Sequence, residues 1–377
     1  MATWTEREQK RVDGCDVVVV GAGLMGAAVA VRLARAGFET ALLEAQVVAG
    51  GATGRSAGMA LTGLGGHYNW AVSAYGRQQA REVWSLTVEG RERLVEAAER
   101  LAVPVEKTGS LALAVEDVEA DALEESAVLL QEDGFDVRFE PGDPLGRGFR
   151  AALHHPADVM VDGAALTRSL LASEEVSVHE RTEVYDLEPE KESVRVWAQG
   201  RNVLCSAVVL AVNGYAPLLD PYFTDKVAPT RSLIFATEPL DRPVLEQPCY
   251  ADYGYEYCCQ LPDRRLLLGG WRRPQSSGQG KGGAPELGDV VRDGLAHFAS
   301  YYFPDVEIQS ADRWSGIMGF TPDGLPLLGR LPALPQVYFA VGLGGRGLSW
   351  AFVLADRLMA LMLNDAEPDI LSAARFA

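Results

Sequence analysis

The chain has 377 residues, of which 48% are hydrophobic and 23% charged, as is typical of a soluble globular enzyme. This length exceeds what one hydrophobic core usually holds, so we expect two domains, or one domain with a large insertion. The formal net charge of −18 repels phosphate backbones and anionic lipid headgroups, which disfavours nucleic acid as a partner.

The chain shows no pattern of export or membrane insertion. Residues 1–10 mix both signs of charge without an apolar stretch, unlike a signal peptide, and no uninterrupted apolar run is long enough to span a membrane. The five cysteines have no regular spacing and no histidine at a metal-ligand spacing. We therefore expect a cytoplasmic protein with reduced thiols and no metal site.

The first elements in chain order form a predicted βαβ unit with a nucleotide motif. A short apolar strand over 15–20 and a helix over 24–36 enclose Gly21-Ala22-Gly23-Leu24-Met25-Gly26, and a second strand over 40–44 ends in Glu44. The three glycines suit a tight turn, a close approach to pyrophosphate and tight helix packing. Glu44 would accept hydrogen bonds from the adenosine ribose, which excludes NADP more firmly than NAD or FAD.

The loop after the acid favours FAD over NAD. Residues 50–59 are small, with two hydroxyls and one arginine, Arg55. Such a loop suits a pyrophosphate and ribityl chain, although a plain surface loop is the alternative.

The middle of the chain alternates between predicted helices and predicted strands. A long helix is predicted over 69–102, an acid-rich helix over 117–133 and another over 159–171, and short strands lie near 110–115, 176–178, 183–185 and 194–197. The run 207–212 is apolar on both faces, which indicates a central strand that rejoins the N-terminal sheet.

Residues 227–303 alternate with period two, which indicates an antiparallel substrate domain followed by a helix near 289–302. This spacing places Tyr253, Tyr255 and Tyr257 on one face of one strand. With Trp271 they are candidates to enclose the substrate, and ordinary sheet packing is an equal alternative for each.

The chain ends with a strand over 337–341, the loop Gly342-Leu343-Gly344-Gly345-Arg346-Gly347 and a helix over 348–363. No strand follows to carry a ribose acid, so this second glycine motif is not a second dinucleotide unit. A helix N-terminus suits the electron-rich N1–C2=O edge of a flavin. We therefore predict one FAD site built from both ends of the chain.

The predicted fold is α/β, with a Rossmann-like FAD-binding domain and an inserted α+β substrate domain that contains an antiparallel sheet. We assign residues 1–102, 151–226 and 305–377 to the discontinuous FAD-binding domain, and residues 103–150 and 227–304 to the substrate domain.

These pieces resemble the D-amino acid oxidase family, which includes glycine oxidase, sarcosine oxidase and gamma-glutamylputrescine oxidoreductase. The likeness spans nearly the whole chain: the βαβ unit, residues 52–58, 210–215, 260–270 and 314–326, and the C-terminal glycine loop. It implies hydride transfer from a carbon bearing a neutral amine to flavin N5, followed by hydrolysis of the imine.

The motifs and the resemblance together predict the site residues. The catalytic and substrate-site candidates are Tyr255, Tyr257, Trp271, Met318 and Arg346. The cofactor-binding candidates are Gly21, Ala22, Gly23, Leu24, Met25, Gly26, Glu44, Ala45, Ala52, Thr53, Arg55, Ser56, Ala57, Gly58, Met59, Val184, Ala211, Asn213, Gly214, Gly316, Gly342, Gly344, Gly345, Arg346, Gly347 and Leu348.

One departure from the family pattern concerns the substrate. The position that matches the family's carboxylate-clamping arginine holds Met318, so we expect an amine without an α-carboxylate, unless Arg231, Arg272 or Arg346 supplies the clamp. An amino-acid oxidase or dehydrogenase is therefore the alternative, and a non-catalytic FAD-binding subunit is a second one.

Two further departures concern the flavin and the electron acceptor. The segment that matches a flavin-linking cysteine of some sarcosine oxidases contains none, so FAD binding is expected to be non-covalent, with His67 as the one alternative attachment point. Leucines 266–268 stand where sarcosine oxidase has an oxygen-activating lysine, which leaves O2 or another electron acceptor open.

Overall fold

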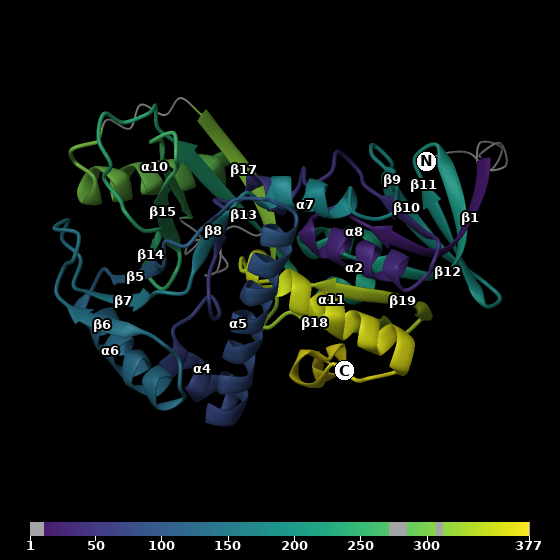
Figure 1. Cartoon of the computed structure of the whole chain (residues 1–377), viewed down its shortest axis with the longest axis horizontal. Helices are drawn as coiled ribbons and strands as arrows, with labels where there is room; N and C mark the ends of the chain where they lie inside the picture. The colour runs from purple at the N-terminus through teal and green to yellow at the C-terminus, as the bar shows by residue number, and fades with distance from the viewer. Residues whose placement is uncertain (1–10, 271–284, 307–311, 377) are drawn as a thin grey trace.

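The computed structural model describes residues 11–270, 285–306 and 312–376, so the candidates Trp271 and Arg272 lie outside the described residues. Two lobes built on two large sheets make up the molecule, and the long helix α5 (Arg77–Arg100) runs between them (Figure 1). The mixture of a largely parallel and a largely antiparallel sheet confirms the predicted α/β class.

The first sheet joins strands from both ends of the chain. Its path runs β10–β11–β12–β1–β2–β9, and β19 pairs with β12 and with β18. The strands β9, β2, β1, β12 and β19 are parallel, which confirms that the apolar run near 207–212 rejoins the N-terminal sheet. The bounds are β1 (Arg11–Val20), β2 (Thr40–Leu43), β9 (Ser177–His179), β10 (Val184–Glu190), β11 (Ser193–Ala198), β12 (Arg201–Leu210), β18 (Leu327–Leu331) and β19 (Leu334–Val341).

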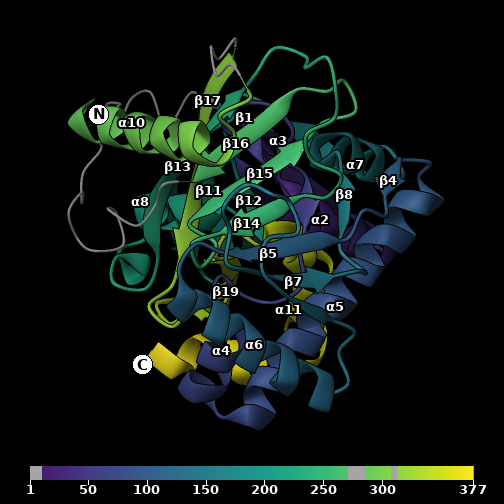
Figure 2. The ribbon, with the colours of Figure 1, turned by 90° about the vertical axis from the view of Figure 1, so that its left-hand side faces the viewer.

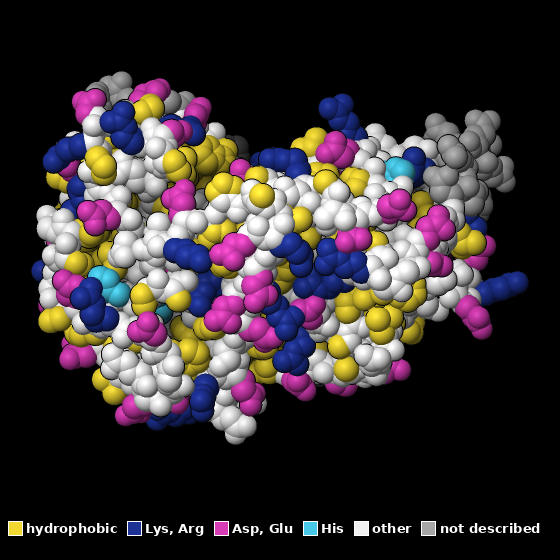
Figure 3. All heavy atoms as spheres, in the orientation of Figure 1, with side chains coloured by type: hydrophobic (Ala, Val, Ile, Leu, Met, Phe, Trp, Pro, Cys, Tyr) yellow, Lys and Arg dark blue, Asp and Glu magenta, His cyan; other side chains and the backbone are white. Residues whose placement is uncertain are grey.

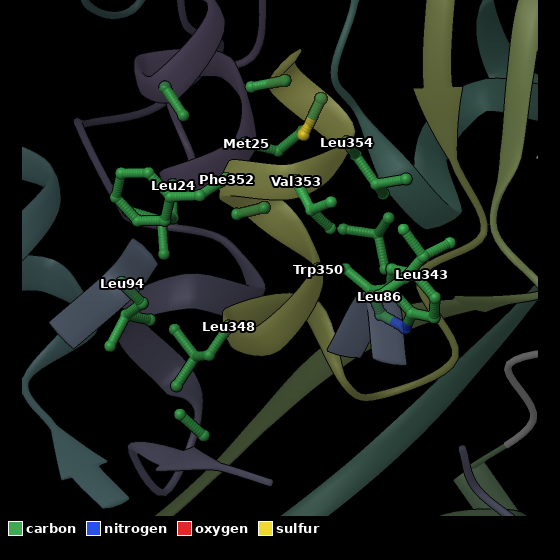
Figure 4. Close-up of a cluster of buried hydrophobic side chains, with 14 of the residues drawn as sticks. Leu24, Met25, Leu86, Leu94, Leu343, Leu348, Trp350, Phe352, Val353 and Leu354 are labelled. Atoms are coloured by element: carbon green, nitrogen blue, oxygen red, sulfur yellow. The ribbon is translucent and has the colours of Figure 1, made fainter. Parts of the chain in front are cut away.

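Both faces of β12 are buried, as the run 207–212 predicted, since Val209 belongs to one core cluster and Val208 and Leu210 belong to another. The neighbouring strand β1 is also buried on both faces. Val17 and Val19 of β1 belong to one core cluster, whereas Val18 and Val20 belong to a second cluster on the opposite face. Helices α2 (Leu24–Arg35), α7 (Gly163–Leu171) and α11 (Gly347–Asn364) contribute to the first cluster with α5. Figure 4 shows side chains of α2, α5 and α11 packed together there.

The second sheet runs in the order β17–β13–β16–β15–β14–β5–β7–β6. Figure 2 views the molecule from the side of this sheet. Helices α6 (Asp117–Glu132) and α10 (Pro285–Tyr302) lie in the same lobe, and Phe298 of α10 and Phe303, just after it, belong to one core cluster with Leu266 and Leu268. The strands are β5 (Ser110–Ala114), β6 (Arg138–Pro141), β7 (Ala151–His155), β13 (Ala228–Ala236), β14 (Cys249–Ala251), β15 (Glu256–Gln260), β16 (Leu266–Gly270) and β17 (Asp312–Phe320).

Short elements complete the fold. A three-stranded sheet has the order β3–β8–β4. The remaining elements are β3 (Met59–Ala60), β4 (Val105–Glu106), β8 (Val159–Val161), α3 (Ala52–Arg55), α4 (Tyr68–Tyr75), α8 (Ala216–Leu219) and four short 3-10 turns at Asn213–Tyr215, Pro221–Phe223, Asp369–Leu371 and Ala373–Phe376.

Two predicted helices were wrong in their extent. The helix predicted over 69–102 is two helices, α4 and α5, because Gly76 between them has a φ of 82°, which ends one helix before the next begins. The helix predicted over 159–171 starts as strand β8, and Asp162 then caps α7 by accepting from the N–H groups of Ala164 and Ala165.

Two strands from segments assigned to the FAD-binding domain belong to the sheet of the other lobe. β7 and β17 fall within the segments 151–226 and 305–377 that the sequence assigned to FAD binding, yet both pair in the second sheet. Their antiparallel partners β5 and β13 fix this placement, because backbone hydrogen bonding and not sequence position decides which sheet a strand joins.

Surface and core agree with a folded globular protein. Helix α11 has the length and apolar composition of a membrane-spanning helix, yet 56% of its residues are buried inside the protein, where it packs against α5 and α2. It is the one such helix in the described part of the chain. Basic and acidic side chains are interspersed on the face shown in Figure 3.

The contact between α5 and α11 depends on Gly90. A Cβ atom at this position would collide with the carbonyl oxygen of Ser349 and lie 3.2 Å from Cγ1 of Val353. The close approach also lets the Ser349 hydroxyl donate to the carbonyl of Leu61 at 2.7 Å, which ties α11 to the segment after β3.

Gly90→Ala should destabilise the protein by about 1–3 kcal/mol, because the added methyl overpacks this contact although alanine favours helix formation. Chemical denaturation would measure the change. Ser85→Ala, on the exposed side of the same helix, is the control and should change the free energy of unfolding by less than about 0.5 kcal/mol. Equal stability of Gly90→Ala and the unmodified protein would show that the helices separate without cost.

Candidate active site

The turn from β1 into α2 is built around glycines. Gly21 has a φ of 100°, and a Cβ there would lie 2.9 Å from the carbonyl oxygen of Ala211 at the end of β12. A Cβ on Gly26 would collide with the carbonyl oxygen of Gly21. A Cβ on Gly23 would have one neighbour within 4 Å outside the adjacent backbone, the Oγ1 atom of Thr53 at 3.2 Å. The backbone at the N-terminus of α2 is therefore open for an anionic ligand to approach.

Glu44 follows β2 directly, at the same edge of the sheet. Its carboxylate accepts hydrogen bonds from the N–H groups of Ala22 and Gln46, each at 2.8 Å. The backbone of Glu44 is tied to the segment just before β10, because the N–H of Thr182 donates to the carbonyl of Glu44 at 2.7 Å. The buried candidate Val184 lies two residues further on, and the candidate Ala45 is exposed beside Glu44.

The loop after β2 turns through the short helix α3 and crosses to the second sheet. The hydroxyl of Thr53 accepts from the N–H of Leu24 at 3.1 Å, so the loop lies against the first glycine turn. Arg55 donates to the carbonyls of Gly50 and Ser315, each at 2.8 Å. These bonds lay the predicted flavin loop between the first glycine turn and β17.

The second glycine loop is attached to the end of β12. Oδ1 of Asn213 accepts from the N–H groups of Gly342 at 3.1 Å and Leu343 at 3.0 Å. The N–H of Gly344 donates to the carbonyl of Gly319 at 3.0 Å. The candidate Gly214 is packed under β17, since a Cβ there would lie 2.8 Å from the carbonyl oxygen of Met318.

A pocket between the two lobes is lined by the flavin loop, by β17 and by the second glycine loop. Of the candidates, it is lined by Ala52, Arg55, Ser56, Ala57, Met59, Tyr257, Gly316, Met318, Gly344, Gly345 and Arg346. It is also lined by residues that the sequence did not single out: Leu61, Gly65, Ser232, Ile234, Tyr250 and Gly254. No carboxylate, imidazole or lysine side chain is among these lining residues.

The prediction that three tyrosines share one strand face was wrong. Asp252 and Tyr253 have φ values of 51° and 55°, so residues 252–255 form a turn and β15 starts at Glu256. Tyr257 is the one of the three that lines the pocket, where its hydroxyl lies 3.2 Å from that of Ser232. Tyr255 does not line the pocket, and Tyr253 packs against the ring of His67 with the ring centroids 4.9 Å apart.

Arg346 is the most buried charged group in the pocket lining, with 9% of its surface exposed. Its guanidinium lies over the ring of Tyr250, 4.7 Å from the centroid, and its Nη1 atom has no hydrogen-bond partner in the structure. Burial raises the pKa of the Tyr250 phenol, and the Arg346 cation opposes that rise. A buried guanidinium with an unused donor is a binding site for an anionic or carbonyl group.

A buried network supports Tyr250 from behind. The Tyr250 hydroxyl lies 3.4 Å from Nε2 of His155, and burial lowers the pKa of His155, which keeps its ring neutral. The nearby carboxylate of Asp158 accepts from the N–H of Thr62 at 2.9 Å and from Nη1 of Arg91 at 3.2 Å. The positive charge of Arg91 is thereby paired below the pocket, whereas Arg346 has no ion-pair partner among the residues that the structure describes.

The structure limits the alternatives for a carboxylate clamp. Met318 lines the pocket as predicted, and Arg346 lies in the same pocket. Arg231 is exposed and donates to Oγ of Ser315 at 3.0 Å, and it points to the opposite face of β13 from the lining residue Ser232.

The alternative of a covalent flavin link through His67 finds no support in the pocket lining. Nε2 of His67 lies 3.2 Å from the buried carboxylate of Glu119, and His67 is not in the pocket lining. All five cysteines are free thiols. Within the described ranges, no group of three or more His, Cys, Asp or Glu side chains is placed to hold a metal ion.

These features fit FAD. The open glycine cradle would receive the pyrophosphate, the Glu44 carboxylate would face the adenosine ribose, and the buried donor of Arg346 lies beside the second helix N-terminus. The residues that fit FAD lie around the N-termini of α2 and α11, the two helices whose glycine motifs the sequence indicated.

Comparison with known proteins supports this assignment over nearly the full length. The gamma-glutamylputrescine oxidoreductase of Escherichia coli is 27% identical over 94% of this chain and 84% of its own. The glycine oxidase of Geobacillus kaustophilus is 26% identical, covering 87% of each chain. The crystal structure of that glycine oxidase superposes with a TM-score of 0.77 at 23% identity, covering 95% of this chain and 96% of the other.

The L-proline dehydrogenase of P. horikoshii has the same fold, with a TM-score of 0.78 at 19% identity over 97% of this chain and 98% of the other. The sequence model of the DAO family, described as FAD dependent oxidoreductase, matches residues 16–361. The chain therefore belongs to the DAO family of FAD-dependent oxidoreductases.

Proposed function

We propose that the protein oxidises the C–N bond of a small amine or amino acid to an imine, which water then hydrolyses. The observation that carries this proposal is a pocket with polar side chains that is lined by the flavin loop and by the glycine loop before α11, while Thr53 holds the same flavin loop against the glycine turn before α2. When bound, FAD supplies the hydride acceptor, its N5 atom. We further propose that FAD is bound without a covalent link and that the enzyme works in the cytoplasm.

The residues of the chain bind, orient and exclude water. Gly21, Gly23 and Glu44 would hold the nucleotide half of the cofactor, and the loop around Arg55 would cover its middle. Tyr257 and Ser232 place two hydroxyls in the pocket that can hydrogen-bond an amine nitrogen. Ile234 and Met318 add apolar walls that remove water from the reacting carbon.

The pocket lining contains no side-chain base. Because the lining residues include no carboxylate, imidazole or lysine, the amine has to enter deprotonated, or lose its proton to water before the hydride leaves. Leu267, on the strand where a lysine would activate oxygen, is buried in an apolar cluster. This supports an electron acceptor other than oxygen.

Gly23→Val should abolish FAD binding, because its side chain would project beside Thr53 into the path of the pyrophosphate. Glu44→Ala should weaken binding by about 1–3 kcal/mol through the loss of hydrogen bonds to the ribose. Titration of the apoprotein with FAD, followed by fluorescence, measures both effects.

Glu39→Ala is the matched control for Glu44→Ala. Glu39 is exposed and precedes β2, whereas Glu44 follows the other end of that strand. Removing the Glu39 carboxylate should therefore leave the FAD affinity unchanged. Unchanged FAD affinity in both Gly23→Val and Glu44→Ala would refute the assignment of this site.

Anaerobic mixing with a panel of amines, polyamines, N-methyl amino acids and D- and L-amino acids tests the activity itself. We expect at least one class to bleach the flavin absorbance, with a rate that rises with pH as the substrate amine loses its proton. Subsequent exposure to oxygen or to a quinone then identifies the acceptor. A flavin that no member of the panel reduces would instead favour a non-catalytic FAD-binding subunit.

A further inference from the structure

One part of the pocket wall is made by two glycines from distant parts of the chain. Gly65 and Gly254 both line the pocket, and a Cβ atom on Gly254 would lie 3.1 Å from the carbonyl oxygen of Gly65. Gly65 is exposed, and a Cβ atom there would meet no atom within 4 Å outside the adjacent backbone. This part of the wall therefore borders solvent and leaves open space where another residue would place a side chain.

The turn that carries Gly254 has an unusual backbone. Asp252, Tyr253 and Gly254 have φ values of 51°, 55° and 78°, a left-handed conformation that is rare for a bulky residue such as Tyr253. Two hydrogen bonds of 3.0 Å define the shape of the turn, from the N–H of Gly254 to the carbonyl of Ala251 and from that of Tyr255 to the carbonyl of Asp252. These bonds lie within the turn, so its position relative to the pocket has to be fixed by a contact from outside.

A carboxylate on helix α6 supplies this contact. Glu119 is fully buried, and its Oε1 atom accepts from the N–H of Tyr253 at 2.5 Å. The same oxygen lies 3.2 Å from Nε2 of His67, whose ring packs against that of Tyr253, and Oε2 accepts from the N–H of Val115 at 2.8 Å. One buried carboxylate thus joins the turn to the segment before α4, two residues away from Gly65.

Packing of the core alone does not account for an acid at this position. Leu123 and Ala127 continue the same buried face of α6 with apolar side chains. Burying a carboxylate is unfavourable unless it is hydrogen-bonded, so Glu119 depends on the partners that it holds. Glu119 is not in the pocket lining, and it therefore acts on the pocket through the turn.

We propose that Glu119 is a positioning residue, which holds Gly254 and Gly65 in the arrangement that sets the size of substrate that the pocket admits. Its contact with Tyr253 fixes the turn, and its contact with His67 fixes the segment that faces the turn. The proposal rests on the proposed function, since it takes this pocket to be the substrate site. Loosening these contacts should admit larger substrates, whereas a side chain at residue 65 should exclude them.

Hydrogen exchange of the FAD-loaded protein tests the role of Glu119 without any substrate. In Glu119→Gln, which keeps one of the two acceptor oxygens, the amides of residues 63–67 and 250–257 should exchange about tenfold faster, with the rest of the chain unchanged. His67→Phe keeps a ring against Tyr253, so it should produce a smaller change in the same segments and decides the question if Glu119→Gln does not fold. Glu124→Gln, on the exposed side of α6, is the matched control and should change neither segment.

Steady-state kinetics test the selectivity, with a small and a large member of the substrate class that reduces the flavin. Glu119→Gln should raise the ratio of kcat/KM for the large over the small substrate about threefold, through KM, and leave kcat within about twofold. Gly65→Val should lower the same ratio about threefold, because its side chain fills open space in the pocket. The FAD affinity should stay unchanged in both variants, which a general loss of structure would not allow.

Three results would overturn the inference: exchange in Glu119→Gln that is unchanged in the two segments or faster throughout the chain, a ratio of large to small substrate that is the same in all variants, or loss of FAD from Gly65→Val. The last of these would assign the open space to the cofactor. Turnover of a panel substrate with an unchanged ratio would leave the proposed oxidation of a C–N bond intact. Locally faster exchange, in a protein whose flavin no amine or amino acid reduces, would support the role of Glu119 in holding the wall and contradict the proposed function.

Discussion

The site depends on the carboxamide of Asn213, which ties together segments from three parts of the chain. Its oxygen accepts from the backbone of Gly342 and Leu343, so the C-terminal glycine loop is attached to the end of β12 beside the N-terminal turn. Asn213 has a φ of 47°, a conformation that asparagine tolerates better than most residues. A Cβ on Gly319 would lie 2.8 Å from the same oxygen, so β17 also approaches closely.

Because of this arrangement, the two lobes meet at the pocket through short backbone contacts. The C-terminal loop before α11 and strand β17 line the pocket, and the N-terminal turn before α2 lies against the flavin loop through the hydrogen bond from Leu24 to Thr53. A helix N-terminus stabilises negative charge beside it, so the starts of α2 and α11 suit the pyrophosphate and the electron-rich edge of the flavin ring.

The sequence predicted the features that are set by local backbone requirements. The glycine turns, the acid after β2 and the strand that rejoins the sheet each depend on a few adjacent residues, and their positions are as expected. Period-two spacing misled at Tyr253, because left-handed backbone at Asp252 and Tyr253 makes a turn where the pattern indicates a strand. Tyr250 and Ser232 were missed because only strand pairing over long sequence separations brings them to the pocket.

The central claim is that one FAD site is assembled from both ends of the chain, and the FAD dissociation constant of Asn213→Gly tests it most directly. Glycine accepts the left-handed backbone at this position, so the substitution removes the two hydrogen bonds to the C-terminal loop without adding strain. The account predicts a dissociation constant that rises about tenfold, in a protein with unchanged circular dichroism, because two hydrogen bonds of about 1 kcal/mol each are partly replaced by water. An unchanged dissociation constant would contradict it, since the C-terminal loop would then hold no part of the cofactor.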